Sequence, residues 1–343
     1  MPPSAPPTVC RWGGRGGVAA AFLSHRSKRF LLMDSCRVSR VAVVVAYFLV
    51  YVVWGSTYFF IGVALQGLPP FLLGALRFSA AGLLLLAVCA LRGERVLRAG
   101  LVRRSAVSGL VLLFVDMAVV MLAQRYVSSS LVAIVASSTA VWIMLLDVPA
   151  WRTTFRNPAA VAGILLGFVG VAMLYIEQLG ASASAAHGER GVALLVCGCL
   201  SWAVGTLYTK YRSCAAEASG GFAGSAWQML TASGAFWVCA VAGGDVQETD
   251  FESVPRRAWL ALAYLVVCGS IMAYTAYVWL LRVRPATEVA THAYVNPVVA
   301  VAIGAGIGGE TVTVVQLCGL MVILLSVALV RLRRGQLRLR QRG

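Results

Sequence analysis

The sequence predicts an all-α integral membrane protein with ten transmembrane helices, arranged as two inverted five-helix repeats. Of its 343 residues, 60% are hydrophobic and only 12% are charged, whereas a soluble domain carries about 25% charged residues. The formal net charge of +16 would indicate nucleic-acid binding in a soluble chain. In this chain the basic residues lie in short loops between apolar runs, which is typical of membrane orientation signals. We therefore expect no nucleic-acid partner.

Ten apolar runs follow one another, each near the roughly 20 residues that cross a bilayer. Residues 1–40 before them are rich in Pro, Arg, Gly and Ser, so we expect a disordered basic tail. A transit peptide would have a similar composition. The composition favours the other interpretation, in which translation starts at Met33 and the preceding residues are not part of the folded protein. Residues 332–343 are expected to form a basic cytoplasmic tail. The expected spans are 41–64, 70–91, 106–123, 130–150, 158–176, 191–209, 222–242, 258–281, 286–308 and 313–331.

The loop charges test the number and direction of these spans. With a cytoplasmic N-terminus, 24 of the 29 Lys and Arg residues fall in inside segments, 4 fall in outside loops, and Arg77 lies within a span. Such an excess of Lys and Arg is typical of cytoplasmic loops. Because one span more or fewer would scramble this alternation, the charges favour a multi-pass plasma (inner) membrane protein with both termini in the cytoplasm.

Short similarities between the two halves predict the repeat. Trp54–Tyr58 (WGSTY) in the first span resembles Trp202–Tyr208 (WAVGTLY) in the sixth, and Gln124–Ala133 resembles Leu281–Ala290. We place the repeats at 41–177 and 191–331. Because each repeat holds five spans, the second must enter the membrane in the opposite orientation. Inverted repeats are typical of secondary transporters, whose site lies near the midplane between the halves.

Several motifs resemble those of a known family and occur in the family's order. They are Trp54–Thr57 (WGST), Leu68–Phe71 (LPPF), Leu76–Phe78 (LRF), Val141–Asp147 (VWIMLLD), Gln228–Leu230 (QML), Gly269–Leu281 (GSIMAYTAYVWLL), Ala290–Val301 (ATHAYVNPVVAV) and Gly309-Glu310. With these motifs, residues 41–331 resemble the EamA family of the drug/metabolite transporter superfamily. The resemblance implies a ten-helix bundle that exports or exchanges small metabolites, often coupled to protons.

The chain departs from the family pattern in its first repeat. Where the family usually has Gly-Glu after the fourth span, this chain has Pro149–Phe155 (PAWRTTF). No proline stands near Ala140 to mirror Pro297, and Asp116 occupies a position where similar chains often carry Asn. These departures concern the gating region of the first repeat and draw attention to Asp116.

Polar and aromatic residues within the spans are the candidates for a substrate path. Tyr47, Tyr51, Trp54 and Tyr58 lie on one face of the first span, where they could stack on an organic substrate or pack at the lipid interface. The expected path residues are Trp54, Thr57, Tyr58, Arg77, Asp116, Trp142, Trp202, Gln228, Tyr274, His292, Tyr294, Asn296 and Pro297.

Two charged residues lie deep in the first repeat. Arg77 could bind an anionic group such as a substrate carboxylate, pair with Asp116, or extend outward to the interface. Asp116 lies near the middle of the third span, where it could load and release the protons that drive transport. Alternatively, it stays permanently paired or neutral.

A polar stripe runs along the ninth span, where Glu288, His292 and Asn296 recur at every fourth residue. Glu288 could instead be an acid at the helix start, and His292 is either a proton relay or a packing residue. Pro297 frees a backbone carbonyl one turn back, so Asn296 and Pro297 together could hold a polar ligand. The candidates for proton coupling are Asp116, Glu288 and His292.

The sequence favours a secondary transporter, not an enzyme, that exports amino-acid-like or drug-like metabolites by alternating access. The alternative is a membrane-embedded enzyme, such as a lipid-modifying transferase, which would need clustered His, Asp, Glu or Cys at one membrane face. A primary pump would need a phosphate-binding loop of the Gly-x-x-x-x-Gly-Lys-Ser/Thr type, and the sequence has none. We expect a small-molecule substrate and membrane lipid as partners, with no cofactor and no metal site. Whether the chain forms a homodimer stays open.

Overall fold

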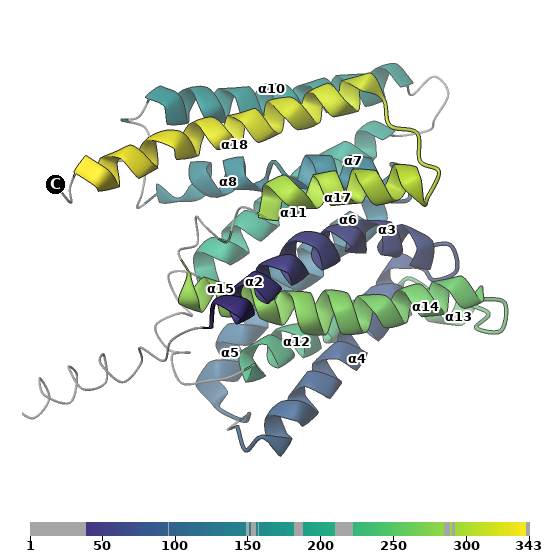
Figure 1. Cartoon of the computed structure of the whole chain (residues 1–343). Coiled ribbons are helices and arrows are strands. Elements are labelled where there is room, and N and C mark those ends of the chain that lie inside the picture. Colours follow the sequence, from purple (N-terminus) through teal and green to yellow (C-terminus); the bar gives the residue numbers. More distant parts are fainter. Residues whose placement is uncertain are drawn as a thin grey trace, which may run out of the picture. The chain divides into compact units, whose positions relative to one another are not determined.

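The computed structural model of the chain describes residues 39–94, 96–148, 151, 156, 158–181, 188–209, 222–284, 289 and 292–340. The chain divides into a unit of residues 1–43, of which only 39–43 are described, and a unit of residues 44–343 that contains the packed helices (Figure 1). Every regular element in the described residues is helical, and none of those residues forms a strand. This confirms the predicted all-α class.

The first half of the chain contains three helices that change geometry or break along their length. The first expected span is one continuous helix built from α2 (Arg40–Phe48), the π-helical segment η1 (Leu49–Val53) and α3 (Trp54–Ala64). It is followed by α4 (Pro70–Leu91), the continuous helix α5 (Ala99–Ser108), η2 (Gly109–Val115) and α6 (Asp116–Ala123), the broken pair α7 (Ser129–Ala136) and α8 (Thr139–Leu146), and α10 (Pro158–Ala181).

The second half has a similar succession of helices. It consists of α11 (Gly188–Tyr208), α12 (Ala223–Ala242), the short α13 (Asp245–Glu248), the continuous helix α14 (Arg256–Tyr264), η5 (Leu265–Tyr274) and α15 (Thr275–Val283), then α17 (His292–Gly306) and α18 (Val314–Arg340). The third segments of the two halves both turn π-helical after about three turns, η2 after the 10 residues of α5 and η5 after the 9 residues of α14.

Six of these helices are long and apolar enough to cross a membrane. They are Arg40–Ala64, Pro70–Leu91, Ala99–Ala123, Ser129–Leu146, Glu189–Tyr208 and Arg256–Val283. Shorter apolar helices, Val161–Glu177, Val295–Gly306 and Val314–Ser326, lie within three further expected spans. The remaining expected span, 222–242, corresponds to α12, whose interior carries the polar residues Gln228, Thr231 and Ser233.

Two helices extend more than five residues beyond the expected spans. The third span begins at Ala99 rather than at residue 106, and α18 runs on to Arg340 through most of the basic tail. Hydropathy ends a span where arginines appear, but arginine and leucine are good helix formers. The helical backbone therefore continues past the apolar segment in both cases.

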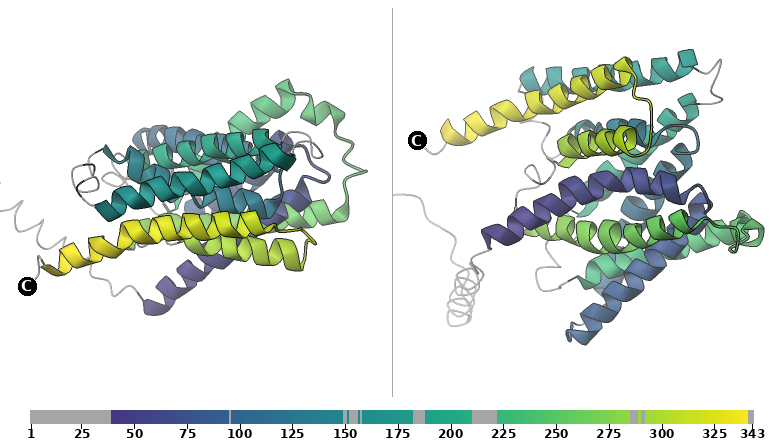
Figure 2. Two further views of the ribbon diagram at one scale, coloured as in Figure 1. Left: turned by 90° about the horizontal axis from the view of Figure 1, so that it is seen from above. Right: turned by 45° about the vertical axis from the view of Figure 1, so that its right-hand side comes forward.

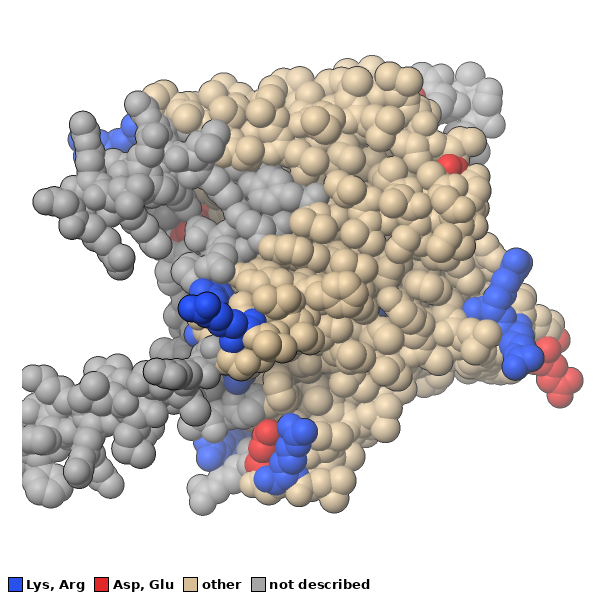
Figure 3. Space-filling model, in the orientation of Figure 1, with Lys and Arg blue, Asp and Glu red and all other residues tan. Residues whose placement is uncertain are grey.

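The outer surface of the helices fits a hydrocarbon environment. Large apolar side chains are exposed on several helices, with Leu83 of α4 59% exposed, Leu165 of α10 61% and Val238 of α12 70%. On the face shown in Figure 3, charged side chains gather at the edges and the surface between them is uncharged. Contiguous apolar surface of this kind marks a membrane-facing or interaction surface.

The helices pack in pairs that bring distant parts of the sequence together. α10 lies along α18, as Figures 1 and 2 show, and α4 packs against α12. α17 packs against both α7 and α3, α11 packs against α6 and α8, and α14 packs against α3. Each of these contacts joins the first half of the chain to the second.

Glycines set how closely two of these pairs approach. A Cβ atom built on Gly109 of η2 would collide with the backbone of Gln228 in α12, and one on Gly55 of α3 would lie 3.1 Å from the Cα atom of Asn296 in α17. Backbones come this close only where a residue has no side chain, as is common between membrane helices.

We predict opposite effects for alanine at two mid-helix glycines. Gly109→Ala should destabilise the protein by about 1–3 kcal/mol, because the backbone of Gln228 cannot move aside as a side chain would. Gly234→Ala in α12 is the matched control, since nothing lies within 4 Å of its Cβ position; it should be neutral or stabilising by up to about 1 kcal/mol. Thermal unfolding in detergent measures both. Equal effects would contradict the close η2–α12 contact.

Candidate functional site

Three π-helical segments lie directly beside residues that the sequence singled out. Trp54 follows η1, Asp116 follows η2, and Tyr274 is the last residue of η5. A π-helical turn widens the helix and changes which carbonyl each N–H meets, and such turns occur frequently at functional sites. The sequence analysis found the three side chains but not this backbone feature, which has no simple residue signature.

Four aromatic rings gather around Trp54, and the five together form what we call the aromatic cluster: Trp54, Trp202, Tyr274, Tyr277 and His292. The Trp54 ring stacks on His292, with centroids 5.5 Å apart and planes inclined by 20°. It also meets Trp202 at 5.5 Å and Tyr277 at 5.1 Å. Tyr277 is 5% exposed and was not among the expected path residues. It lies one turn after Tyr274 on the same helix, and this spacing could have found it.

A chain of hydrogen bonds holds Tyr274 in place. The Tyr274 hydroxyl donates to Oε1 of Gln228 at 2.6 Å, and Nε2 of Gln228 donates to the hydroxyl of Ser108 at 2.9 Å. All three side chains are buried. The chain joins η5, α12 and α5, so it fixes one wall of the aromatic cluster to helices from both halves. Ser108 was not expected from the sequence.

Asp116, the first residue of α6, lies within electrostatic range of Tyr58 in α3 and close to Gly198 in α11. Its carboxylate interacts electrostatically with Tyr58 and Cys199, and Tyr58 is one turn after Trp54 in α3. A Cβ atom on Gly198 of α11 would lie 3.3 Å from Oδ1 of Asp116, so the glycine leaves room for the carboxyl group. Asp116 is 7% exposed. Within the described residues it forms neither an ion pair nor a hydrogen bond through its side chain.

Arg77 of α4 is the second deep charge. Its side chain is 2% exposed, and Nε donates to the hydroxyl of Ser270 in η5 at 2.8 Å. Pairing with Asp116 was one of the alternatives expected from the sequence. Arg77 and Asp116 form no ion pair in the structure. Thr57, expected in the path, turns its hydroxyl back to the carbonyl oxygen of Trp54 at 2.6 Å.

Asn296 ties α17 to the π-helical segment η1. With its amide nitrogen oriented towards acceptors, Asn296 donates to the carbonyl oxygens of Val50 and Tyr51, both at 3.0 Å, and of His292 at 3.2 Å. Pro297 follows it within the helix and cannot supply a backbone N–H. The amide nitrogen of Asn296 therefore donates to backbone carbonyls. It is not available to the polar ligand that the sequence analysis placed at Asn296 and Pro297.

The remaining expected residues lie elsewhere or are not described. The Trp142 ring contacts Phe168 of α10 edge-on at 5.1 Å and makes no ring contact with the aromatic cluster. Nδ1 of His292 lies 3.0 Å from the carbonyl oxygen of Val289. Glu288 and the side chain of Tyr294 lie outside the described residues.

A carboxylate clasp joins the end of α17 to the start of α7. Gly309 has a φ of 65°, a left-handed conformation that suits glycine, and it turns the chain so that Glu310 meets Ser129 and Ser130. The carboxylate accepts from both backbone N–H groups (3.2 and 3.0 Å) and both hydroxyls (2.5 and 2.6 Å). A carboxylate at a helix N-terminus also interacts favourably with the helix dipole.

Comparison with known proteins gives one family. The model of the EamA-like transporter family matches residues 41–176 and 189–332, once in each half. This confirms the resemblance found in the sequence motifs.

Two relatives carry names that refer to transport. The "Uncharacterized inner membrane transporter YedA" of Escherichia coli strain K12 is 34% identical over 292 residues, which is 84% of this chain and 90% of the relative. The "Probable amino-acid metabolite efflux pump" of Salmonella typhimurium is 28% identical over 280 residues, 80% of this chain and 90% of that protein. A solved structure titled "Crystal structure of protein" matches with a TM-score of 0.62 at 20% identity, over 87% of this chain and 99% of that one. That match shows the fold alone.

The clasp gives a testable expectation. Glu310→Gln should lower the stability by about 1–3 kcal/mol, because two charge-assisted acceptors are replaced by a neutral amide whose nitrogen faces backbone donors. Thermal unfolding of the detergent-solubilised protein measures the loss. Glu252→Gln, at an exposed loop position, is the control and should leave the melting temperature unchanged. If both substitutions behave alike, the clasp does not hold α7 to α17.

Proposed function

Because the chain belongs to the EamA-like transporter family, we propose that it is a secondary active transporter that exports small amino-acid-like or drug-like metabolites. It works by alternating access across the plasma membrane. The multi-pass apolar helices and the relative named an inner membrane transporter support the location. The relative named a probable amino-acid metabolite efflux pump supports the substrate class and the direction.

The proposal includes ten spans in two inverted five-helix repeats. The helix pairings support it, since α4–α12, α7–α17 and α10–α18 join the second, fourth and fifth expected spans of one half to their counterparts in the other. The contact of α6 with α11 has its counterpart in the contact of α14 with α3. η2 and η5 also occupy matching positions. Equivalent helices of the two halves thus make equivalent contacts, as expected for two repeats related by a two-fold axis.

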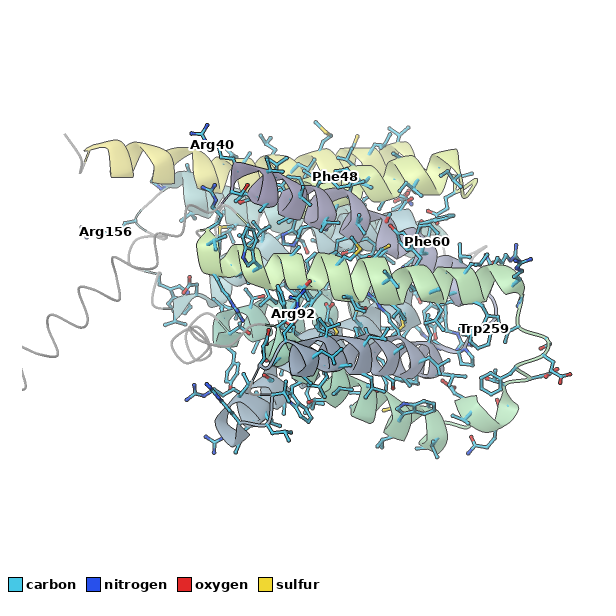
Figure 4. The ribbon with its side chains drawn as sticks, turned by 60° about the horizontal axis from the view of Figure 1, so that its bottom comes forward. Arg40, Phe48, Phe60, Arg92, Arg156 and Trp259 are labelled. Carbon is cyan, nitrogen blue, oxygen red and sulfur yellow. The ribbon has the colours of Figure 1, made fainter. Side chains whose placement is uncertain are left out.

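Both termini are proposed to be cytoplasmic. The excess of Lys and Arg in the alternate loops supports this direction. In Figure 4, Arg92 and Arg156, which belong to expected inside segments, lie towards one end of the helices, and Trp259, next to an expected outside loop, lies towards the other.

The aromatic cluster is the observation that carries the proposal. It takes Trp54 from the first half and its other four members from the second, and the Asp116 carboxylate lies near Tyr58, one turn further along α3. Aromatic faces bind organic solutes by stacking and bind cations through the ring quadrupole. A site assembled from both halves is the place where a rearrangement between the halves would change access to a bound solute.

Asp116 is the residue that we propose to carry the coupling proton. A buried carboxylate without an ion-pair partner can exchange a proton with each side of the membrane in turn as access alternates. The alternative function, a membrane-embedded enzyme, is less well supported, because both kinds of named relative are transporters or efflux pumps.

The test uses vesicles reconstituted with the full chain and a library of radiolabelled amino acids and cationic dyes. An acidic lumen should drive accumulation of at least one solute by exchange for protons. Asp116→Asn should abolish this accumulation but leave solute exchange at equal pH on both sides, because only the driven mode needs a titrating carboxyl. Retained exchange separates lost coupling from a misfolded protein.

Asp250→Asn, in an exposed loop, serves as the charge-matched control and should accumulate solute as the wild type does. If accumulation in Asp116→Asn equals that of the wild type, Asp116 is not the coupling residue. If no member of the library crosses the membrane in either mode, the proposed transport function fails for these substrate classes.

A further inference from the structure

Arg77 is a buried cation that has no counter-charge among the residues that the structure describes. It lies in the interior of α4, a helix long and apolar enough to cross the membrane, and only 2% of its side chain is exposed. Nε is bound to the hydroxyl of Ser270, and Cζ lies 5.0 Å from the centroid of the neighbouring Phe78 ring. Nη1 is buried and has no hydrogen-bond acceptor among the described residues. A neutral hydroxyl and a ring face do not neutralise the charge.

Burying an unpaired guanidinium within a membrane-spanning helix costs free energy. A charged side chain within the hydrocarbon region normally pairs with an opposite charge, faces a watery cavity or marks a ligand path. A guanidinium also has no neutral form that it can adopt in a protein, because it stays protonated under all ordinary conditions. An anion that binds to Arg77 during function would offset the free energy of burying it.

The helices pack closely around the guanidinium of Arg77. Gly269 precedes Ser270 in the π-helical segment η5, and a Cβ atom there would lie 3.3 Å from Nη2 of Arg77 and 2.9 Å from Cγ2 of Thr57. The glycine therefore allows η5 to approach Thr57 of α3 and Arg77 of α4 closely, and a side chain at this position would crowd the guanidinium. Thr57 precedes Tyr58, which lies within electrostatic range of Asp116. Arg77 and Asp116 therefore flank α3 at adjacent residues.

We propose that Arg77 binds the carboxylate of the transported solute, with Ser270 holding the guanidinium in position. This deepens the proposed function and rests on it: the substrates are carboxylic acids. Nε is committed to Ser270, which leaves the Nη groups to donate charge-assisted hydrogen bonds to carboxylate oxygens. The aromatic cluster then receives the apolar part of the solute.

Two other anions are less consistent with the geometry. An internal pair with Asp116 does not form, although both residues are buried and lie beside the same helix. A lipid phosphate would have to reach a group that is 2% exposed and faces Ser270 of η5 and Thr57 of α3 rather than the bilayer.

The experiment compares matched acids and amides on the full chain in detergent and in phosphatidylcholine vesicles. The probes are L-leucine with L-leucinamide, L-phenylalanine with L-phenylalaninamide, and benzoate with benzamide. Ligand binding is measured by the rise in melting temperature and by competition with the solute transported in the vesicle assay. In the wild type, at least one acid should bind on the order of tenfold or more tightly than its amide, because the amide cannot neutralise the guanidinium.

Arg77→Gln should remove this preference and leave amide binding unchanged, while Arg77→Lys should keep part of it, since lysine retains the charge but not the planar fork. Without ligand, Arg77→Gln should be at least as stable as the wild type, because an unpaired buried charge has been removed. A purely structural role would instead lower its melting temperature. Arg257→Gln, exposed at the start of α14, is the control and should retain the acid preference.

Several results would overturn the proposal. Equal binding of acids and amides, or no binding of any acid, by the wild type would do so, as would an undiminished acid preference in Arg77→Gln. A preference lost in Arg77→Gln but restored by adding Asp116→Asn would show that Arg77 neutralises Asp116 instead. A preference seen in phosphatidylcholine vesicles but lost in vesicles that also contain the anionic lipid phosphatidylglycerol would assign the site to a lipid headgroup. Transport of solutes without any acid preference would leave the proposed function intact.

Discussion

Inside the bilayer a polar group can be satisfied only by the protein itself, because hydrocarbon offers neither donors nor acceptors. The helices meet this constraint in two ways. Ser56, Thr57, Ser137 and Ser326 bond back to carbonyl oxygens three residues earlier in their own helices. Where the helices depart from regular geometry, side chains from other helices supply the partner. Asn296 meets the carbonyls of η1, and Glu310 meets the free N–H groups at the start of α7.

The same constraint makes the unsatisfied groups informative. Arg77 and Asp116 are both buried, and neither has an ion-pair partner among the described residues. They flank α3 at the level of Thr57 and Tyr58. A cation and an anion left apart in a low-dielectric interior keep a large electrostatic energy available. In the proposed mechanism the carboxylate of the solute neutralises Arg77 and a proton neutralises Asp116, and both binding steps gain this electrostatic free energy.

Rigid and changeable contacts are distributed differently along the helices. The contacts at Gly109 and Gly55 bring backbone against backbone and leave no room for adjustment. The Glu310 clasp, by contrast, is made only of hydrogen bonds at the end of two helices. If α7 and α17 separate during alternating access, this clasp is the contact that must break. The close pairs would then move as units.

The sequence by itself determined the membrane class, the family and the positions of the apolar helices, because hydropathy, loop charge and motif order are properties of short segments. It also identified Trp54, Trp202, Tyr274 and His292, since an aromatic or polar residue in an apolar run stands out without knowledge of its neighbours. It could not assign Tyr277 or Ser108 to the site, exclude Trp142 from the aromatic cluster, or find the π-helical segments. Those depend on which helix faces meet. Only the tertiary structure decided that the amide of Asn296 serves the backbone and that Arg77 and Asp116 remain apart, because pairing between residues far apart in sequence is fixed by packing and not by local pattern.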